Sequence, residues 1–437
     1  MPALAQTGEG TITGTVLDTS GAAVPNATVT IANEGTSIAT SKTTGTDGGY
    51  RFDAVLPGSY TVTTKASGFA TTEMKGIIVR ASQVTPLNVT IEVSESQTIV
   101  EVTSAAPLVQ TATSDLTHTV ENTQIIDTPL LSRNVYDLVF AIPSVSPGMD
   151  MGATSGGVRE SGTTVLLNGA DNNDNFSEAS VNITPPLESV QEYTVLTNQM
   201  SAQYGHAAGA LVSVEQKTGT NQLHGALYEF NRNRSLNAST FFQNRSNAPK
   251  PKYVRNQFGG EVGGPIKKDK TFFMAAYDQV TLPQGGIILF SGNPTPVPTP
   301  SLASQITAAA AGNPIVSYYL TKYPLLTSTT LCPNESQSAI GNIGCDSIFD
   351  PNSSPEKHIV GRVDHTFSDK DRLTFVANIS RLDYTDKYGG GYPSAVPIGS
   401  ADGEHYGNVN LVETHTFGPS VYNELTVAQN RHYSKFI

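Results

Sequence analysis

One stretch of the sequence gathers oxygen-bearing side chains at a spacing that could bind a cation or a polar ligand. It consists of Asp171, Asn172, Asn173, Asp174 and Asn175. Positions 171, 173 and 175 fit the start of a calcium loop, where alternate carboxylate and amide oxygens are ligands. Phe176 stands where that loop needs glycine, and Asn182 where it needs a bidentate glutamate. The stretch therefore predicts no metal site. We expect a polar loop, which either is plainly solvated or contacts a ligand.

Residue patterns that carry enzyme or cofactor chemistry are missing from the sequence. The eight histidines are dispersed, and there is no His-Glu-x-x-His, Gly-x-Ser-x-Gly or phosphate-loop motif. The glycine-rich stretch 256–266 is no dinucleotide loop, because no βαβ unit surrounds it and Pro265 prevents a normal helix start. We expect neither an enzyme nor a bound cofactor. A net charge of −12 argues against a nucleic-acid partner.

The two cysteines, Cys332 and Cys345, lie in one loop rich in Pro, Ser and Asn. Without a Cys-x-x-Cys or Cys/His array, zinc binding is not expected. In an oxidising compartment the pair could close a small disulfide loop; the alternative is two unpaired thiols.

The elements that would position these residues begin with residues 9–95. Short alternating strands separated by turns every 8–12 residues are typical of an antiparallel β-sandwich. Strands are expected near 11–16, 27–31, 37–43, 49–52, 58–65, 73–79 and 85–93.

A short β-branched segment follows and comprises Thr98, Ile99, Val100, Glu101, Val102 and Thr103. It could be the last sandwich strand, a linker strand, or an extended segment that a partner protein binds by strand addition, which needs exposed backbone rather than exact side chains.

The pattern turns mixed α/β between about Ala105 and Thr220. Residues 122–129 and 134–140 show helical spacing, with Ser132 or Asn134 as a possible cap of the second piece. A strand at 163–167 leads into the turn Asn168-Gly169. Residues 186–195 predict a short helix that is followed by a strand. Residues 201–221 predict a bend, a buried strand and a turn.

From Gln222 onward, long strands alternate apolar and polar residues. Ile359, Val363 and Phe367 share one face of a strand, and His358, Arg362, Asp364 and Thr366 share the other. About seven such strands are expected, near 222–232, 254–264, 270–281, 356–367, 371–384, 405–417 and 420–433. Tight turns such as 368–371 contrast with the long connection 282–355, as in outer-membrane barrels. A soluble sandwich is the alternative that shares this alternation.

Two local patterns in the first hundred residues resemble a known family. Residues 46–52 (Thr-Asp-Gly-Gly-Tyr-Arg-Phe) and 56–62 (Leu-Pro-Gly-Ser-Tyr-Thr-Val) resemble the carboxypeptidase regulatory-like domain, a seven-stranded prealbumin-type sandwich with a carbohydrate-binding-like fold. No His/Glu ligand set accompanies them, so the resemblance implies no catalysis.

A second resemblance covers the middle of the chain. Arg159, Asn168-Gly169, residues 187–195 and the positions Tyr204, Gly205 and Gly209 match, in order, the plug domain of TonB-dependent outer-membrane receptors. The named single residues are expected to serve plug packing and turn geometry. Asn168 replaces a common Asp, and alanines flank Gly209 where paired glycines are usual, so the resemblance does not extend to ligand identity.

Together the resemblances imply an Oar-like, mainly β receptor. The expected parts are a signal-peptide remnant at 1–8, a sandwich at 9–95, a mixed α/β plug at 96–220 and the first strands of an antiparallel outer-membrane β-barrel at 221–437. The implied function is energy-dependent uptake of a large nutrient, glycan, peptide or metal chelate. The implied partners are a TonB-type periplasmic protein at residues 98–103, the outer-membrane bilayer, and an extracellular ligand at 171–175, a loop expected at the outer apex of the plug. Surface adhesion or polysaccharide binding without transport is the alternative.

Both ends of the sequence suggest a longer protein. Met1–Gln6 ends like a secretory cleavage site but lacks the preceding basic and apolar regions. Seven strands cannot close a plugged barrel of roughly 22, so we expect further strands after Ile437 and no working pore from this stretch alone.

Overall fold

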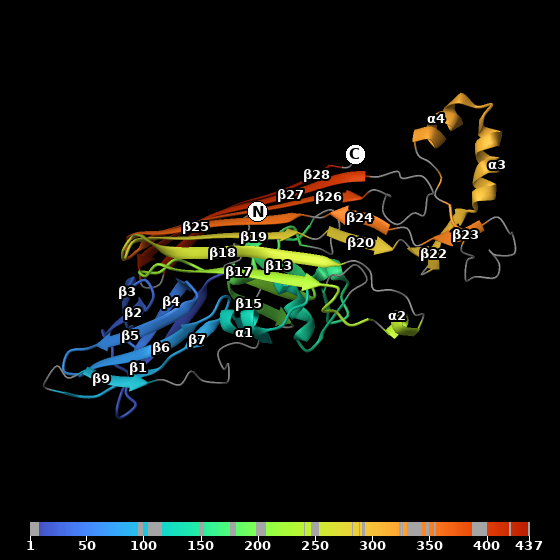
Figure 1. Cartoon of the computed structure of the whole chain (residues 1–437). Helices are drawn as coiled ribbons and strands as arrows, with labels where there is room; N and C mark the ends of the chain where they lie inside the picture. Colours follow the sequence, from blue (N-terminus) through green and yellow to red (C-terminus); the bar gives the residue numbers. More distant parts are fainter. Residues whose placement is uncertain are drawn as a thin grey trace.

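The computed structural model of the chain places a β-sandwich, a plug and a long curved sheet in sequence order (Figure 1). It describes residues 8–94, 99–103, 116–147, 153–174, 181–197, 207–239, 241–245, 253–281, 283–287, 289–290, 293–322, 325, 327–329, 343–346, 349–353, 355–386, 400–418 and 421–435.

The sandwich consists of two sheets around one apolar core. Its strands are β1 (Gly10–Asp18), β2 (Thr28–Asn33), β3 (Ala39–Thr43), β4 (Gly49–Val55), β5 (Gly58–Lys65), β6 (Thr71–Val79), β7 (Val84–Pro86) and β8 (Val89–Ile91). Alternate side chains such as Ile12, Val29, Phe52 and Val62 point inward and are almost fully buried. This confirms the predicted sandwich.

The sandwich differs from the prediction at its last strand. Residues 85–93 form two short strands, β7 and β8, and both run parallel to β1 rather than antiparallel. Gly14 permits this approach, because a Cβ there would lie 1.8 Å from the Leu87 carbonyl oxygen. The strictly antiparallel sandwich was therefore a wrong expectation.

Strand β9 (Ile99–Thr103) completes the second sheet, whose order is β3-β2-β5-β6-β9. It runs parallel to β6, with Ile99 opposite Thr71 and Thr103 opposite Lys75. The structure thus realises the sandwich-strand alternative for this segment. Thr98 lies outside the described residues.

The plug is built on a five-stranded sheet in the order β10-β15-β16-β13-β14. These strands are β10 (Thr117–Glu121), β13 (Thr164–Leu167), β14 (Ala170–Asp171), β15 (Val190–Thr197) and β16 (Ala210–Gln216); β11 (Val145–Pro147) pairs with β12 (Ala153–Ser155) beside it. The helical turns are α1 (Asn122–Asp127), η1 (Val135–Ala141), η2 (Glu160–Gly162) and η3 (Leu187–Ser189). The predicted cap is present, since Asn134 accepts a hydrogen bond from the Tyr136 backbone N–H at 2.9 Å.

Seven long antiparallel strands form what we call the wall sheet. They are β17 (His224–Asn233), β18 (Val254–Lys267), β19 (Thr271–Thr281), β25 (Glu356–Ser368), β26 (Asp371–Asp386), β27 (Ser400–Gly418) and β28 (Val421–Lys435), paired in sequence order. Each matches one of the seven predicted strands. The ends that face the sandwich are joined by short turns, and we call this the turn end (Figure 1).

The long connection after β19 leaves from the opposite end of the wall sheet, which we call the loop end. Its described parts are β20 (Pro283–Ile287), β21 (Leu289–Phe290), β22 (Asn293–Pro298), α3 (Pro300–Ala310), α4 (Pro314–Lys322), β23 (Ile343–Asp346) and β24 (Phe349–Ser353). The short helix α2 (Phe241–Arg245) lies between β17 and β18. None of the helices in the described ranges is long and apolar enough to cross a membrane. Cys332 lies outside those ranges, so the disulfide alternatives stay open.

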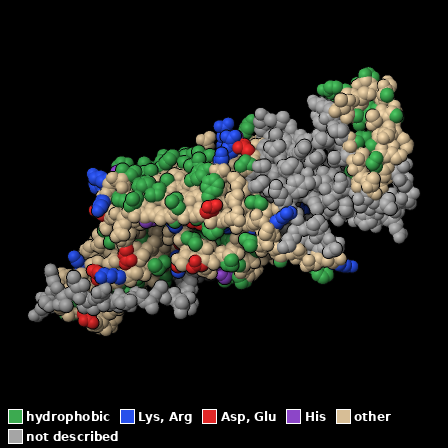
Figure 2. Space-filling model, in the orientation of Figure 1, with side chains coloured by type: hydrophobic (Ala, Val, Ile, Leu, Met, Phe, Trp, Pro, Cys, Tyr) green, Lys and Arg blue, Asp and Glu red, His purple; other side chains and the backbone are tan. Residues whose placement is uncertain are grey.

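The wall sheet exposes apolar side chains on one face and buries many polar side chains on the other. Ile359, Phe375 and Ile379 are exposed, whereas Arg362 and Asn378 on the opposite face are buried. Figure 2 shows hydrophobic side chains gathered as a band over these strands. A water-soluble sheet has the reverse pattern, so this polarity fits strands that face lipid on one side.

The sandwich is fastened to the turn end of the wall sheet through Asn221. Its backbone N–H donates to the Gly35 carbonyl (2.9 Å) and its side-chain amide donates to the Thr36 carbonyl (2.7 Å). The same amide group also bonds Asp269 in the β18–β19 turn, donating to its carboxylate and accepting from its N–H. One side chain therefore joins a sandwich turn to a wall turn.

Glu192 in β15 forms a buried contact between the plug and the sandwich. Its carboxyl accepts a hydrogen bond from the Ala81 backbone N–H, and the residue is only 4% exposed. Burial raises the pKa of Glu192 to about 7, against the smaller lowering effect of that hydrogen bond. Nearby surface contacts are Arg80–Glu121 at 2.6 Å and Gln83–Thr119 at 2.5 Å.

We expect Glu192 to make the stability of this junction depend on pH. Because the folded-state pKa is raised, stability is full below the unfolded value and falls as pH rises through about 7, by on the order of 3 kcal/mol. Glu192→Gln should remove most of this slope, measured as the thermal unfolding midpoint of detergent-solubilised protein across pH. Glu121→Gln, which changes an exposed carboxylate at the same junction, is the matched control. A Glu192→Gln profile as steep as the unsubstituted one would contradict the assignment.

Candidate functional site between the plug and the wall

The plug covers the polar inner face of the wall sheet through a chain of amide hydrogen bonds. Gln216, at the end of β16, donates to the Asn378 side chain at 2.8 Å and accepts from Asn168 at 2.7 Å. Its carbonyl accepts from Arg362 at 3.1 Å. Asn168 and Gly169 have φ values of +50° and +76°, the left-handed region that a tight turn needs. This turn is one of the contact points between the plug and the wall.

Further contacts extend this interface on both sides. Lys217 pairs with Glu261 of β18 at 2.7 Å, and Asn410 of β27 donates to the Leu167 carbonyl at 3.2 Å. Both partners of each contact are largely buried, so each contact replaces the hydrogen bonds that these polar groups would otherwise make to water.

The polar loop singled out in the sequence lies against β27 and β28. The Asp171 carbonyl accepts a hydrogen bond from Asn430, and the Asp174 carboxylate lies 3.6 Å from the His432 ring. Asn172 is fully buried and its amide donates to the Ile183 carbonyl and the Tyr136 hydroxyl.

Asn173 in the same loop donates to the Thr163 carbonyl and accepts from the Val165 N–H. The amides of Asn172 and Asn173 thus hold the loop together. Asp171 remains exposed, and Asn175 lies outside the described residues. Ligand contact by this loop stays a prediction.

The remaining predicted plug residues have different surroundings. Arg159 has an exposed side chain, and its carbonyl accepts from the Gly162 N–H at 2.9 Å. Gly209 is buried; its N–H donates to the Gly162 carbonyl, and a Cβ would lie 3.3 Å from the Ser155 carbonyl oxygen. Tyr204 and Gly205 lie outside the described residues.

A polar cavity of about 190 Å³, which we call the outer chamber, opens between the plug and the loop end of the wall sheet. It is lined from both sides by Ser132, Arg133, Asn134, Thr184, Pro185, Pro186, Arg255, Gln257, Asp278, Val280, Glu356 and His358.

The plug side of the outer chamber is fixed by Arg133. Its guanidinium pairs with the buried carboxylate of Glu188 and lies 3.6 Å from the centre of the Phe230 ring in β17. A guanidinium held over an aromatic ring gains a cation–π attraction in addition to the ion pair. Arg133 has a φ of +58°, so the backbone adopts an uncommon conformation to aim this side chain at the wall.

The wall side carries a linked set of polar groups. Asp278 accepts hydrogen bonds from the Tyr228 hydroxyl at 2.8 Å and from Gln257 at 3.0 Å. His358 lies 3.0 Å from the Glu356 carboxylate, and Arg255 donates to the Ser132 carbonyl at 2.9 Å. Both charge signs and several amide groups therefore surround one space.

Three buried polar atoms at the outer chamber have no hydrogen-bond partner among the described residues: Arg133 Nε, Gln257 Oε1 and His358 Nδ1. Buried polar atoms are normally satisfied, so unpaired ones mark a place for water or a bound ligand. The sequence placed His358 on a polar strand face but did not indicate that it meets Arg133 and Gln257, because the three residues come from segments far apart in the chain.

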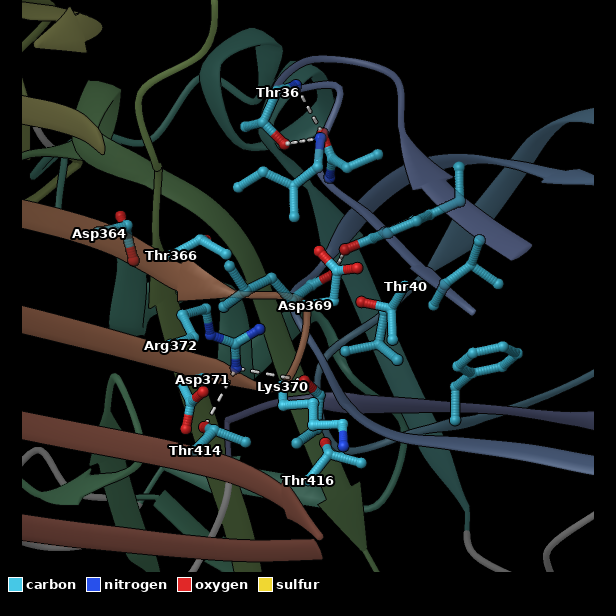
Figure 3. A pocket seen from close by; sticks show the side chains of 18 of the residues that line it. Thr36, Thr40, Asp364, Thr366, Asp369, Lys370, Asp371, Arg372, Thr414 and Thr416 are labelled. Carbon is cyan, nitrogen blue, oxygen red and sulfur yellow. Dashed lines mark hydrogen bonds between the residues drawn. The ribbon is translucent and has the colours of Figure 1, made fainter. Parts of the chain in front are cut away.

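A second cavity, of about 110 Å³, lies at the turn end between the sandwich and the wall sheet (Figure 3). Threonines 36, 40, 366, 414 and 416 line it together with charged residues of the 368–371 turn. Arg372 reaches across it and donates to the Ala54 carbonyl at 3.2 Å and to the Thr414 hydroxyl at 3.4 Å. The cavity thus separates two domains that Arg372 connects.

One group of possible metal ligands occurs among the described residues. Asp371, Glu413 and His415 bring one donor atom each to within 4.8 Å of one another, near the turn end. His415 already pairs with Asp371 at 2.5 Å, so the group is a hydrogen-bonded cross-strand pair with a neighbouring carboxylate.

Comparisons with known proteins agree with this architecture. The outer membrane beta barrel domain family matches residues 216–436, half of the chain, and the carboxypeptidase regulatory-like domain matches residues 11–92. The TonB-dependent transporter Oar of Myxococcus xanthus is 23% identical over 285 residues, which are 61% of this chain and 26% of the transporter. The chain therefore spans about a quarter of that relative.

Solved structures of outer-membrane proteins are similar to part of this chain at low sequence identity. The outer membrane transporter YddB from Escherichia coli has a TM-score of 0.50 at 9% identity, covering 72% of this chain and 38% of YddB. The siderophore receptor PirA from Pseudomonas aeruginosa has a TM-score of 0.45 at 13% identity, covering 74% of this chain and 41% of PirA.

The match to half of the chain, together with the sandwich, plug and wall described above, leads to one conclusion. The chain belongs to the outer membrane β-barrel family as a TonB-dependent receptor relative of the Oar-like kind, located in the outer membrane.

Proposed function

We propose that the protein takes up an extracellular ligand across the outer membrane, with energy supplied by a TonB-type periplasmic protein. The observation that carries the proposal is the outer chamber, which lies between plug and wall at the loop end and holds unpaired buried polar atoms. In outer-membrane barrels the long loops are extracellular and the short turns periplasmic. The outer chamber then faces the side from which a ligand arrives.

The chemistry of the outer chamber favours a polar ligand. Arg133 and Arg255 supply donors, whereas Asp278, Glu356 and Gln257 supply acceptors. A ligand that hydrogen-bonds both the plug and the wall would replace contacts between them, and this would couple binding to movement of the plug. A metal chelate, glycan, peptide or other large nutrient could present such groups, and Asp171–Asp174 would add a second contact surface beside β28.

The partner segment is β9, which lies at the edge of the sandwich sheet. Only one of its edges pairs with a described strand, β6, so the other offers backbone groups for strand addition. A partner strand would then extend the sandwich sheet, and force on β9 would act on a segment that leads directly into the plug. Residues 98–103 therefore keep the predicted role of partner site, presented by the sandwich.

We expect uptake of the ligand to require β9, whereas we expect binding of the ligand not to require it. In cells that express the protein from its own gene, Val100→Pro and Glu101→Pro each remove one N–H, and neighbouring residues point these groups to opposite strand edges. The substitution that removes the N–H pointing away from β6 should abolish accumulation of the transported probe. The probe is found by testing a radiolabelled ferric chelate, a fluorescent oligosaccharide and a labelled oligopeptide for gene-dependent uptake.

Surface binding of the same probe should stay unchanged in both proline variants. Retained binding together with undiminished uptake in both would contradict a role of β9 in energy coupling. Binding without energy-dependent uptake in the unsubstituted protein would favour adhesion.

Ligand affinity is expected to depend on the outer chamber. Arg255→Ala removes a half-buried donor from the chamber, and a lost charged hydrogen bond should weaken probe binding by about tenfold or more. Arg381→Ala, which breaks the exposed Arg381–Asp383 pair on the same wall, is the matched control and should bind normally. Equal affinity of the two variants in a probe-binding titration would place the ligand elsewhere.

A further inference from the structure

The N-terminal segment that precedes β1 inserts between the plug and the wall. Gly8 packs directly on the Glu215 carboxylate, because a Cβ at Gly8 would lie 2.0 Å from its Oε1. Glu9 follows, pairs with Arg372 of β26 and has a side chain only 10% exposed. The segment is thus the point where sandwich, plug and wall meet.

This meeting point contains more buried negative than positive charge. Four carboxyls, those of Glu9, Glu215, Asp364 and Glu424, lie around two guanidiniums, those of Arg362 and Arg372. Arg362 is fully engaged with Asp364 (2.9 and 3.0 Å) and the Gln216 carbonyl, and Arg372 with Glu9. Two negative charges would remain uncompensated if every group were ionised, which is costly in a buried site.

Glu9 and Glu424 meet across this site without a donor between them. Oε2 of Glu9 and Oε2 of Glu424 are both buried at this site, and each has no hydrogen-bond partner among the described residues. Two facing carboxylates repel each other, whereas one proton between them turns the repulsion into a strong hydrogen bond. A cavity of about 30 Å³, the size of one water molecule, adjoins them.

We propose that Glu9 and Glu424 share one proton, and that this proton fastens the N-terminal segment, and with it the sandwich, to the inner face of the wall. A metal ion fits the site between Glu9 and Glu424 less well than a proton does. Among the described residues, only Asp371, Glu413 and His415 gather three ligand atoms within 4.8 Å of one another, and the junction carboxyls do not.

The groups around the pair come from every element that packs on it. Glu215 belongs to the plug; Arg362, Asp364, Arg372 and Tyr422 to the wall; Asp53, Arg51 and Tyr60 to the sandwich. Burial raises the pKa of Glu9 against the lowering effect of Arg372, and burial also raises the pKa of Glu215. A carboxyl whose pKa is raised in the docked state holds its proton more tightly there than in the undocked state. Docking is therefore favoured at low pH and weakens as pH rises.

The consequence is a sandwich whose attachment responds to proton concentration. Loss of the shared proton places a second negative charge beside Glu9 and pushes the N-terminal segment away from the wall. Because the segment continues into β1, the sandwich would leave the turn end and uncover the cavity beneath it. This pH-dependent attachment of the sandwich does not depend on which ligand the outer chamber binds.

The test measures docking by electron paramagnetic resonance between spin labels at exposed Thr19 of the sandwich and Lys268 of the β18–β19 turn. Both positions are changed to Cys in detergent-solubilised full chain that carries Cys332→Ser, Cys345→Ser and Glu192→Gln, so that Glu192 contributes no titration. With Glu424 present, the ratio of docked to undocked protein should fall by about tenfold between about pH 5.5 and about pH 8.5.

In the Glu424→Gln variant the carboxamide can donate permanently to Glu9, so the docked ratio should stay constant over the same range. Glu413→Gln, on the outward face of the neighbouring strand, should keep the full pH dependence. A constant ratio in the presence of Glu424, or an undiminished slope in Glu424→Gln, would overturn the proposal. A ratio that follows added CaCl2 at fixed pH would also overturn it, in favour of a bound cation.

Discussion

The polar inner face of the wall sheet requires hydrogen-bond partners, and most of the structure follows from how they are supplied. Strands that expose Ile359, Phe375 and Ile379 to lipid must place Arg362 and Asn378 on the opposite side. A buried amide or guanidinium without partners costs about as much as several good contacts gain. The plug meets this need with backbone carbonyls and the Asn168–Gln216 pair, so the plug and the wall fold as complementary surfaces.

The plug satisfies the buried polar groups of the wall at some places and leaves them without partners at others, and this difference bears on function. Each nitrogen of the Arg362 guanidinium has a partner, either the Gln216 carbonyl of the plug or the Asp364 carboxylate of the same strand. At the outer chamber, Gln257 and His358 keep buried atoms without partners among the described residues. The proposed uptake requires such a boundary, because a plug bonded to the wall everywhere could not move when a ligand or a partner acts on it.

The sequence predicted features that depend on local periodicity. The alternation in 356–367 and 371–384 gave both the strands and their lipid-facing sides, because period two along a strand maps directly onto two faces. It could not give the parallel pairing of β9 with β6, since parallel partners far apart in the chain carry no turn signal. The Asp171–Asp174 loop was recognised as polar, but an exposed amide and the buried amide of Asn172 have the same sequence letter.

The carboxyls at the domain junction were also missed, although a signal existed. Glu192 and Glu215 interrupt apolar runs in β15 and β16, and they are direct cross-strand partners. One contacts the sandwich at Ala81 and the other contacts the N-terminal segment at Gly8, whereas the next residue, Gln216, bonds the wall. Two adjacent plug strands therefore touch the sandwich, the N-terminal segment and the wall. A change at the sandwich can reach the wall through a single pair of strands, without a long chain of intermediate contacts.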